Sequence, residues 1–147
     1  MFPTDNNNFI ADTASAVLTP DPVIKNNLKF NFSENQFQVV DGRVLQIADI
    51  PAIKQWIEKF IRTSLGQTPI YEGQKFGTTI KNVIGYKSLN NGFSESEAER
   101  ELSEGFLLNP AIEKVTYVDI SKVDDVSTID VGAQLKDGSN LEGRFNV

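Results

Sequence analysis

Apolar and polar residues alternate with a period of two at both ends of the chain. The alternating segments are residues 28–33, 37–40 and 43–48 near the start, and residues 112–120, 126–135 and 141–145 near the end. This period is typical of β-strands with one buried face. Asp41-Gly42, Asp124-Asp125 and Asp137-Gly138 lie between such segments and are suited to tight turns. The pattern therefore predicts antiparallel hairpins at both ends.

The longest alternating segment follows Asn109-Pro110-Ala111-Ile112. A strict period of two places one set of side chains on one face, namely Thr116, Val118 and Ile120, and another set on the opposite face, namely Val115, Tyr117 and Asp119. The last segment, from Leu141 to Phe145, contains neither Lys nor Pro, the residues that commonly protect the edge of a sheet. This part of the chain is therefore a candidate open edge.

A helical period separates the two groups of strands. From Ile50 to Leu65, apolar residues recur at spacings of three and four, and polar residues occupy the other side. Asp49 is suited to cap the start of this helix, and Gly66 is suited to end it in the left-handed conformation. We therefore expect an amphipathic helix over this range that packs on a sheet.

A second helix is expected after a loop over residues 85–92. Ser94 and Glu97 have the spacing of a capping box, and Asn109-Pro110 ends the helix because the residue before Pro disfavours the helical region. The apolar face is formed by Ala98, Leu102 and Phe106. A further short helix is expected over residues 78–84.

These elements predict an α+β fold, in which antiparallel hairpins pack on two main helices within one small domain over residues 28–147. Residues 1–27 are expected to form an extended N-terminal arm, because they are rich in Pro and Asn and have only one basic residue. The arm still contains Phe2, Phe9 and Ile10. Two interpretations remain open: an arm that becomes ordered on a neighbouring protein, and a plain disordered terminus.

Composition removes several classes of function. The chain has no Cys and no His, so thiol and Ser-His nucleophiles are excluded and a zinc site is not expected. Neither a Gly-rich nucleotide-binding motif nor an EF-hand spacing occurs. The net charge is −6, and the basic residues are too few and scattered for a nucleic-acid interface. The sequence also lacks an apolar run long enough to span a membrane. We therefore expect no cofactor, no metal, no nucleic acid and no membrane.

One catalytic interpretation survives these exclusions. Two carboxylates held about 5 to 9.5 Å apart can hydrolyse glycosidic bonds. Glu58, Glu72 and Glu113 are the acids that lie least clearly on solvated runs. Because the sequence specifies no pairing among these three residues, we expect the protein not to be an enzyme.

Two short motifs, in their order along the chain, resemble a known family. Phe76-Gly77 followed by Ile80 is similar to an aromatic-Gly element, and Asn109-Pro110-Ala111-Ile112 is similar to a Glu-Pro-Arg-Ile/Val element that has lost its acidic and basic residues. Between a leading hairpin and a closing hairpin, this order resembles the small baseplate wedge proteins that start the sheath of contractile phage tails. The resemblance covers about residues 28–145 and includes variants from Gram-positive phages and phage-like particles.

The resemblance implies a structural protein of the tail baseplate in the virion, present in six copies around the tail tube. Its partners would be baseplate wedge proteins and the tail sheath protein, with tube or hub proteins as further candidates. The expected interface residues are Phe2, Phe9, Ile10, Phe76, Gly77, Asn109, Pro110, Ile112, Leu141, Glu142, Arg144 and Phe145. A sheet edge of the C-terminal hairpin would pair with a sheath subunit, unless the chain's own arm covers it. The alternatives are a lysozyme-like cell-wall glycosidase and a regulatory binding module of the same fold.

Overall fold

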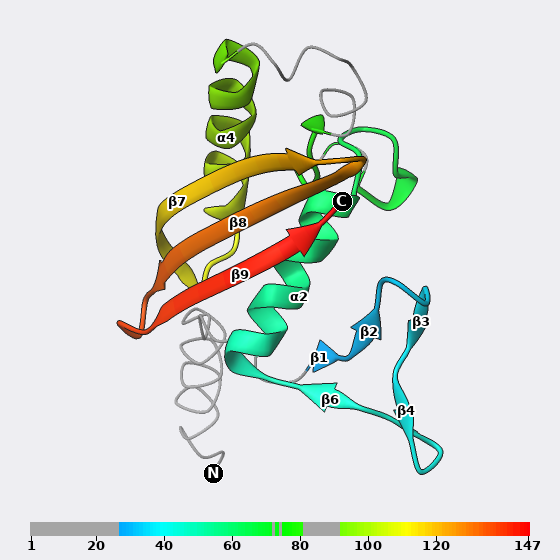
Figure 1. The fold of residues 1–147 in the computed structure, drawn as a ribbon. Coiled ribbons are helices and arrows are strands. Elements are labelled where there is room, and N and C mark those ends of the chain that lie inside the picture. The colour runs from blue at the N-terminus through cyan, green and yellow to red at the C-terminus, as the bar shows by residue number, and fades with distance from the viewer. Residues whose placement is uncertain (1–26, 72, 74, 81–91) are drawn as a thin grey trace, which may run out of the picture.

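A three-stranded antiparallel sheet and two helices form the main body of the chain (Figure 1). The computed structural model describes residues 27–71, 73, 75–80 and 92–147. The expected arm, up to residue 26, and most of the short helix expected over residues 78–84 lie outside this range. The α+β class predicted from the sequence is confirmed.

The sheet contains β7 (Ile112–Val123), β8 (Val126–Leu135) and β9 (Asn140–Asn146), with β8 in the centre. Asp124 begins the turn between β7 and β8 with a φ of 55°, a conformation that Asp tolerates better than most residues. Gly138, with a φ of 88°, lies in the turn before β9. The three strands predicted for this part of the sequence are therefore confirmed.

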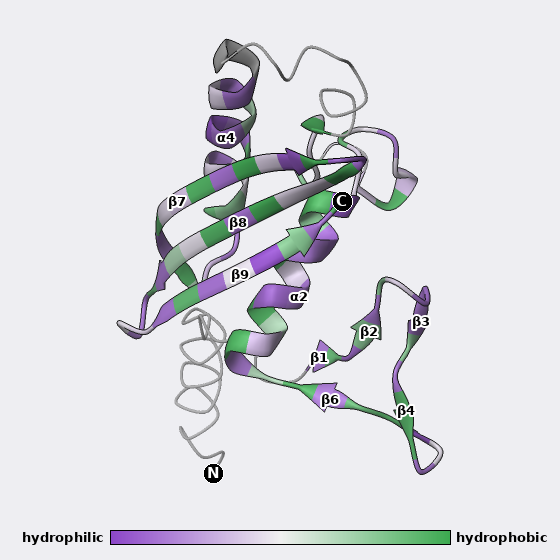
Figure 2. Cartoon of the chain, in the orientation of Figure 1, coloured by the Kyte–Doolittle hydropathy of each residue, from purple (hydrophilic) through white to green (hydrophobic). Residues whose placement is uncertain are grey.

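The faces of β7 differ from the strict alternation expected from the sequence. The register shifts between Ile112 and Lys114, and again between Val115 and Tyr117. Because each bulge adds one residue to the strand, Val115 lies opposite Ala133 and packs on the core, whereas Tyr117 lies opposite Gly132 on the other face. The expectation that Val115 shares a face with Tyr117 is therefore wrong. Figure 2 shows the alternation of apolar and polar residues along the sheet.

Two helices, α2 (Asp49–Arg62) and α4 (Gly92–Phe106), cover one face of this sheet (Figure 1). Their apolar stripes and the inward side chains of the strands form one core. Its fully buried members include Ile53, Ile57, Phe60, Ile61, Leu102, Phe106, Ile129, Val131 and Leu141. The opposite face of the sheet has no helix over it within the described residues. Burial of the helical stripes on the sheet supplies most of the stability of these helices.

The ends of both helices differ from the sequence-based expectation. Asp49 is the first residue of α2, after Ala48, and the helix begins without a side-chain cap. It ends at Arg62 instead of Leu65. Thr63 is extended, and its amide and hydroxyl both donate to the Lys59 carbonyl at the end of the helix. Helix α4 begins at Gly92, so Ser94 is its third residue. The carboxylate expected to complete the capping box, that of Glu97, accepts hydrogen bonds from Arg100.

The two helices approach closely where Gly105 of α4 faces Phe60 of α2. A Cβ placed on Gly105 would lie 2.3 Å from the Phe60 Cζ atom. The Phe60 ring also has aromatic neighbours at centroid distances of 5.5 Å (Trp56), 5.3 Å (Phe76) and 5.7 Å (Phe106). The missing side chain at Gly105 therefore determines how closely α4 can pack on this aromatic cluster.

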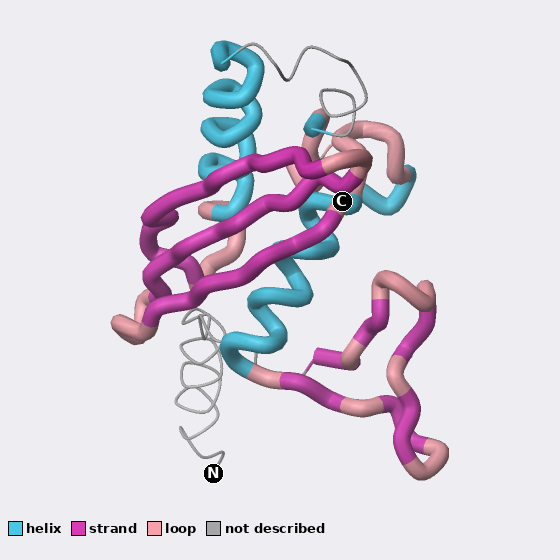
Figure 3. The backbone as a smooth tube through the Cα atoms, viewed as in Figure 1, coloured by secondary structure: helices cyan, strands magenta, loops and turns pink. Residues whose placement is uncertain are grey.

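The N-terminal strands form a ribbon that projects from the body (Figure 3). The sequence predicted three strands here, whereas the structure divides them into three short antiparallel pairs. These are β1 (Asn27–Leu28) with β6 (Gln46–Ile47), β2 (Phe30–Asn31) with β3 (Gln36–Phe37), and β4 (Val39–Val40) with β5 (Arg43–Val44). Three backbone hydrogen bonds join these pairs where they meet. The Lys29 amide donates to the Leu45 carbonyl, the Leu45 amide to the Gln38 carbonyl, and the Gln38 amide to the Lys29 carbonyl. Gln55 of α2 joins the ribbon to the body through the Phe30 amide and the Leu28 carbonyl, both at 2.8 Å.

Candidate assembly interface

The C-terminal strand β9 lies at one edge of the main sheet, and the described part of the chain adds no strand beyond it. The Val147 amide donates to the Ser127 carbonyl, and the Leu135 amide donates to the Ser139 carbonyl, both at 2.8 Å. In an antiparallel ladder, hydrogen-bonded pairs alternate with pairs that exchange no hydrogen bonds. The register therefore directs the backbone groups of residues 141, 143 and 145 toward β8, and those of residues 140, 142, 144 and 146 toward the open side.

One end of this edge already has a partner. The Arg62 guanidinium of α2 donates to the Asn146 carbonyl at 3.2 Å. This contact agrees with the outward direction derived for residue 146. The remaining outward groups belong to Asn140, Glu142 and Arg144, which gives a short row suited to main-chain pairing with an added strand.

The side chains of β9 leave this row accessible. Arg144 reaches back across the sheet to Asp130 of β8, with Nε–Oδ1 and Nη2–Oδ2 distances of 2.7 and 3.0 Å. The guanidinium holds the pKa of the Asp130 carboxyl below its usual value. Because this two-bond pair fixes the direction of the Arg144 side chain, the residue does not guard the edge as a free Lys would.

The other residues expected at the β9 interface are inside the core. Leu141 and Phe145 are buried against the helices. The Phe145 ring lies over Gly143, where a Cβ would meet Cζ at 2.8 Å. Contacts from β9 to a partner would therefore come from its backbone and from the side chains of Glu142 and Arg144 on the face of the sheet away from the helices, not from Leu141 or Phe145.

The opposite edge of the sheet, formed by β7, is less regular. It has the two bulges described above. The Ser127 carbonyl points toward the β9 side, where it accepts from the Val147 amide. The residue opposite Ser127 on β7, Lys122, therefore directs its own backbone groups outward. The β7 edge thus carries a Lys and bulges, two features that commonly discourage the addition of a strand.

The segment Asn109-Pro110-Ala111-Ile112 connects α4 to β7. The Asn109 Oδ1 atom accepts a hydrogen bond from the Ala111 amide at 3.0 Å, and the Asn109 carbonyl accepts one from the Ile112 amide at 3.1 Å. Asn109 and Ile112 are buried, whereas Pro110 is exposed. The residues that depart from the Glu-Pro-Arg pattern, Asn109 and Ala111, therefore shape the turn, and only Pro110 is presented to solvent.

The aromatic-Gly motif also makes contacts within the chain. Phe76 packs on Trp56, Phe60 and Tyr71, at centroid distances of 5.6, 5.3 and 4.5 Å respectively. Gly77 has a φ of 114°, and a Cβ there would lie 2.8 Å from the Thr63 carbonyl oxygen. The motif requires Gly because the loop passes directly over the end of α2.

Sequence reasoning missed the residue that fixes this loop. The Glu101 carboxylate of α4 accepts hydrogen bonds from the Thr78 hydroxyl at 2.9 Å, the Thr79 amide at 2.7 Å and the Thr79 hydroxyl at 2.7 Å. In the sequence, Glu101 is one of several acids on a solvated helix, so only the two adjacent Thr residues could have suggested a carboxylate partner.

The sequence analysis also did not predict the exposed apolar surface of the N-terminal ribbon. The projecting N-terminal ribbon exposes large apolar side chains, namely Leu28, Phe37, Val39, Val40 and Val44. The alternation had indicated half-buried strands, but the described residues cover neither side of the ribbon completely. Phe2, Phe9 and Ile10, the arm residues expected at an interface, lie outside the described residues.

The candidate carboxylates do not meet in a shared site among the described residues. Glu58 forms an ion pair with Arg62 at 3.0 Å on α2, and Glu113 is exposed at the start of β7. Glu72 lies outside the described range. Within that range there is also no cluster of three or more acids that could hold a metal ion, and no helix is long and apolar enough to cross a membrane.

The described residues form a small α+β domain with a sheet edge at β9 that no further described strand covers. The sequence matches the family of contractile injection system sheath initiators over residues 26–138. The chain therefore belongs to this family and is a structural component of a contractile injection system tail, as the two motifs indicated.

A solved structure gives an independent comparison of the fold. The crystal structure of a protein from Geobacter sulfurreducens, proposed to be a tail lysozyme, superposes with a TM-score of 0.54 and 20% sequence identity. The match covers 66% of this chain and 87% of that one. At this identity the likeness establishes a shared fold. No curated protein matches the chain significantly.

Proposed function

We propose that the protein sits on the wedge core of a tail baseplate, in six copies around the tube, and starts the sheath by accepting a strand on β9. The observation that carries this proposal is the row of outward backbone groups at Asn140, Glu142 and Arg144. Membership of the sheath initiator family supports the general role. Wedge proteins and the sheath protein are the proposed partners, with tube or hub proteins as further candidates, and the proposed location is the virion baseplate.

The chemistry of β9 favours it over β7 as the template. An added strand gains affinity from main-chain hydrogen bonds and specificity from neighbouring side chains. The described part of β9 has no bulge in its pairing with β8, and Arg144 is held back by Asp130. A terminal arm of a sheath subunit could therefore pair over residues 140–144 before it reaches the Arg62 contact at Asn146.

The test replaces an outward amide of β9 with Pro. Glu142→Pro removes one edge donor and leaves every hydrogen bond to β8 in place, because the residue 142 amide points away from β8. We expect the variant to fold and to join the baseplate, but to nucleate sheath at a greatly reduced rate in an assembly reaction followed by electron microscopy. Arg144→Pro should act in the same way, with an added loss of the Asp130 pair.

Two matched controls separate the edge amide from other effects. Glu142→Ala removes the same side chain but keeps the amide, and Lys122→Pro removes an outward amide from the opposite edge. Both should nucleate sheath normally. Normal nucleation by a folded Glu142→Pro variant, or a loss of nucleation in Lys122→Pro instead, would contradict the assignment of β9.

No cofactor, metal, nucleic acid or membrane belongs to this role, and the protein acts in it without catalysis. The glycosidase alternative has no specific observation in its favour among the described residues, where Glu58 is paired with Arg62 and Glu113 is exposed at the start of β7. A regulatory module of the same fold would bind its partner outside a tail particle. Co-purification with assembled tails distinguishes that alternative from a baseplate component.

A further inference from the structure

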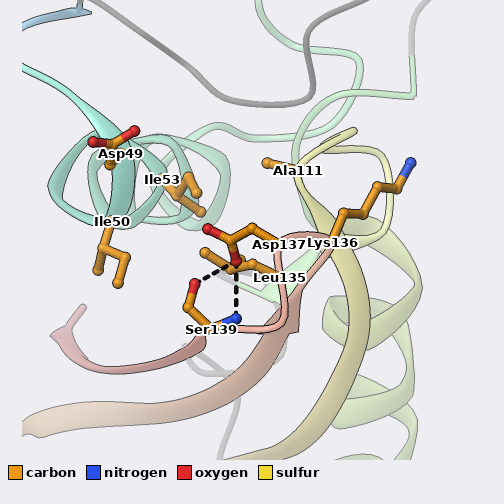
Figure 4. A pocket seen from close by; sticks show the side chains of 8 residues that line it. All are labelled: Asp49, Ile50, Ile53, Ala111, Leu135, Lys136, Asp137 and Ser139. Atoms are coloured by element: carbon orange, nitrogen blue, oxygen red, sulfur yellow. Dashed lines mark hydrogen bonds between the residues drawn. The ribbon is translucent and has the colours of Figure 1, made fainter.

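An apolar cavity of about 450 Å³ lies where the start of α2 meets the turn between β8 and β9 (Figure 4). Ile50, Ile53, Ala111 and Leu135 provide its apolar lining. Its rim is polar and is formed by Asp49, Lys136, Asp137 and Ser139. Asp137 is held in place by the Ser139 amide and hydroxyl, at 2.9 and 2.5 Å. A rigid polar rim around an apolar floor is suited to receiving an apolar side chain that is followed by a charged one.

The pairing of β1 with β6 places the start of the described chain near this cavity. Asn27, the first described residue, lies opposite Ile47 in an antiparallel ladder. Two residues after Ile47 the chain reaches Asp49 on the cavity rim. The segment that precedes Asn27 in the sequence is therefore tethered close to the cavity rim. Three extended residues span about 10 Å, which is more than the length of the two residues that lead from Ile47 to Asp49.

The residues at this position in the arm have the matching chemistry. The segment immediately before residues 26 and 27 is Val23-Ile24-Lys25. It contains two adjacent β-branched apolar residues and the only basic residue among the first 27. Lys25 precedes Asn27 by two residues, and Asp49 follows Ile47, the ladder partner of Asn27, by two residues, so only a short tether separates the basic residue from the acidic rim.

We propose that Val23-Ile24 occupies this cavity within the same chain, with Lys25 paired to the acidic rim at Asp49 or Asp137. The occupied cavity anchors the base of the arm at the turn that precedes β9. Residues further toward the N-terminus, including Phe2, Phe9 and Ile10, then leave from a fixed point beside the β9 edge and remain able to contact a neighbouring protein. This anchor does not depend on strand addition at β9.

The absence of Cys allows a direct test by disulfide trapping in the full-length chain. Ile24→Cys is combined with Lys136→Cys on the cavity rim, and Ile10→Cys with Lys136→Cys is the control pair on the same arm. We expect the first pair to form an intramolecular disulfide at least about tenfold faster than the control, because docking raises the effective concentration of the two thiols. On a non-reducing gel the product should migrate as a monomer.

A disulfide-linked dimer from the first pair would overturn the proposal, because the occupant would then be the arm of a second copy. Equal rates for the two pairs would also overturn it. A second measurement avoids any effect of the engineered thiols. Ile24→Asp should shift the methyl NMR signals of Ile50 and Leu135, whereas Ile10→Asp should leave them unchanged. Unchanged signals in the Ile24→Asp protein would show that the segment does not occupy the cavity.

Discussion

Replacing Gly105 with Ala tests whether the contact between α2 and α4 is as tight as the structure indicates. In an exposed helix interior, this change stabilises a protein by about 1 kcal/mol, because Ala has a higher helix propensity than Gly. Here the new Cβ would lie 2.3 and 2.7 Å from two Phe60 ring carbons. Ordinary carbon contacts are about 3.5–4.0 Å, so the ring or the helix must move by about 1 Å.

The Phe60 ring has little freedom to move away. It is 1% exposed and is enclosed by Trp56, Phe76 and Phe106. Overpacking of this kind costs about 1–3 kcal/mol, which exceeds the propensity gain. We therefore expect Gly105→Ala to lower the free energy of unfolding by up to about 2 kcal/mol, measured by urea denaturation. The melting temperature should fall by about 2–4 °C for each kcal/mol lost.

Two controls identify the cause. Ser103 lies in the same helix as Gly105. Because Ala has a higher helix propensity than Ser, Ser103→Ala should leave the free energy of unfolding unchanged or slightly raise it. In a Phe60→Leu background, where the ring is absent, Gly105→Ala should become neutral or stabilising, so the double-mutant cycle should give a clear coupling energy. A stabilising effect of Gly105→Ala in the otherwise unchanged protein would refute the proposed steric origin.

Two further predictions concern the arm and catalysis. Replacing Phe2, Phe9 and Ile10 together with Asp should leave the melting temperature unchanged but weaken incorporation into baseplates. The reason is that each Phe or Ile fully buried against a neighbour contributes about 1.5–3 kcal/mol before ordering costs. Unfolding of this variant would instead place these residues in the core. The protein should also fail to clear peptidoglycan in a zymogram. This expectation would be overturned if the protein did clear peptidoglycan and a Glu→Gln change at one of the three candidate glutamates abolished the clearing.

Much of the fold could be predicted because local pattern and final packing agree. Apolar and polar residues alternate strongly in β7, β8 and β9, and the apolar stripe of α2 is continuous. The residues that this pattern assigns to a buried face are therefore mostly the ones that pack in the core. The division into an arm over residues 1–27 and a domain over residues 28–147 stays a prediction.

The differences arise where distant residues decide local structure. Helix α2 stops at Arg62 because Ser64 forms a parallel bridge with Thr78, a partner that lies beyond the next loop. Val115 changes faces because of bulges that only the register with β8 defines. The hydrogen bonds to the Glu101 carboxylate come from two Thr residues that lie more than twenty positions earlier. None of these causes is visible within one window of sequence.

Strand β9 also has features that limit unwanted pairing at an open sheet edge. A long, flat, apolar edge invites pairing between copies of the same chain. Strand β9 has seven residues, its last outward carbonyl is engaged by Arg62, and its apolar side chains face the core. The remaining row at residues 140–144 offers few main-chain bonds, so a single added strand gains little affinity from it alone. In the proposed role, stable pairing then requires a sheath arm that is already held in place by the surrounding ring, which restricts strand addition to the assembling tail.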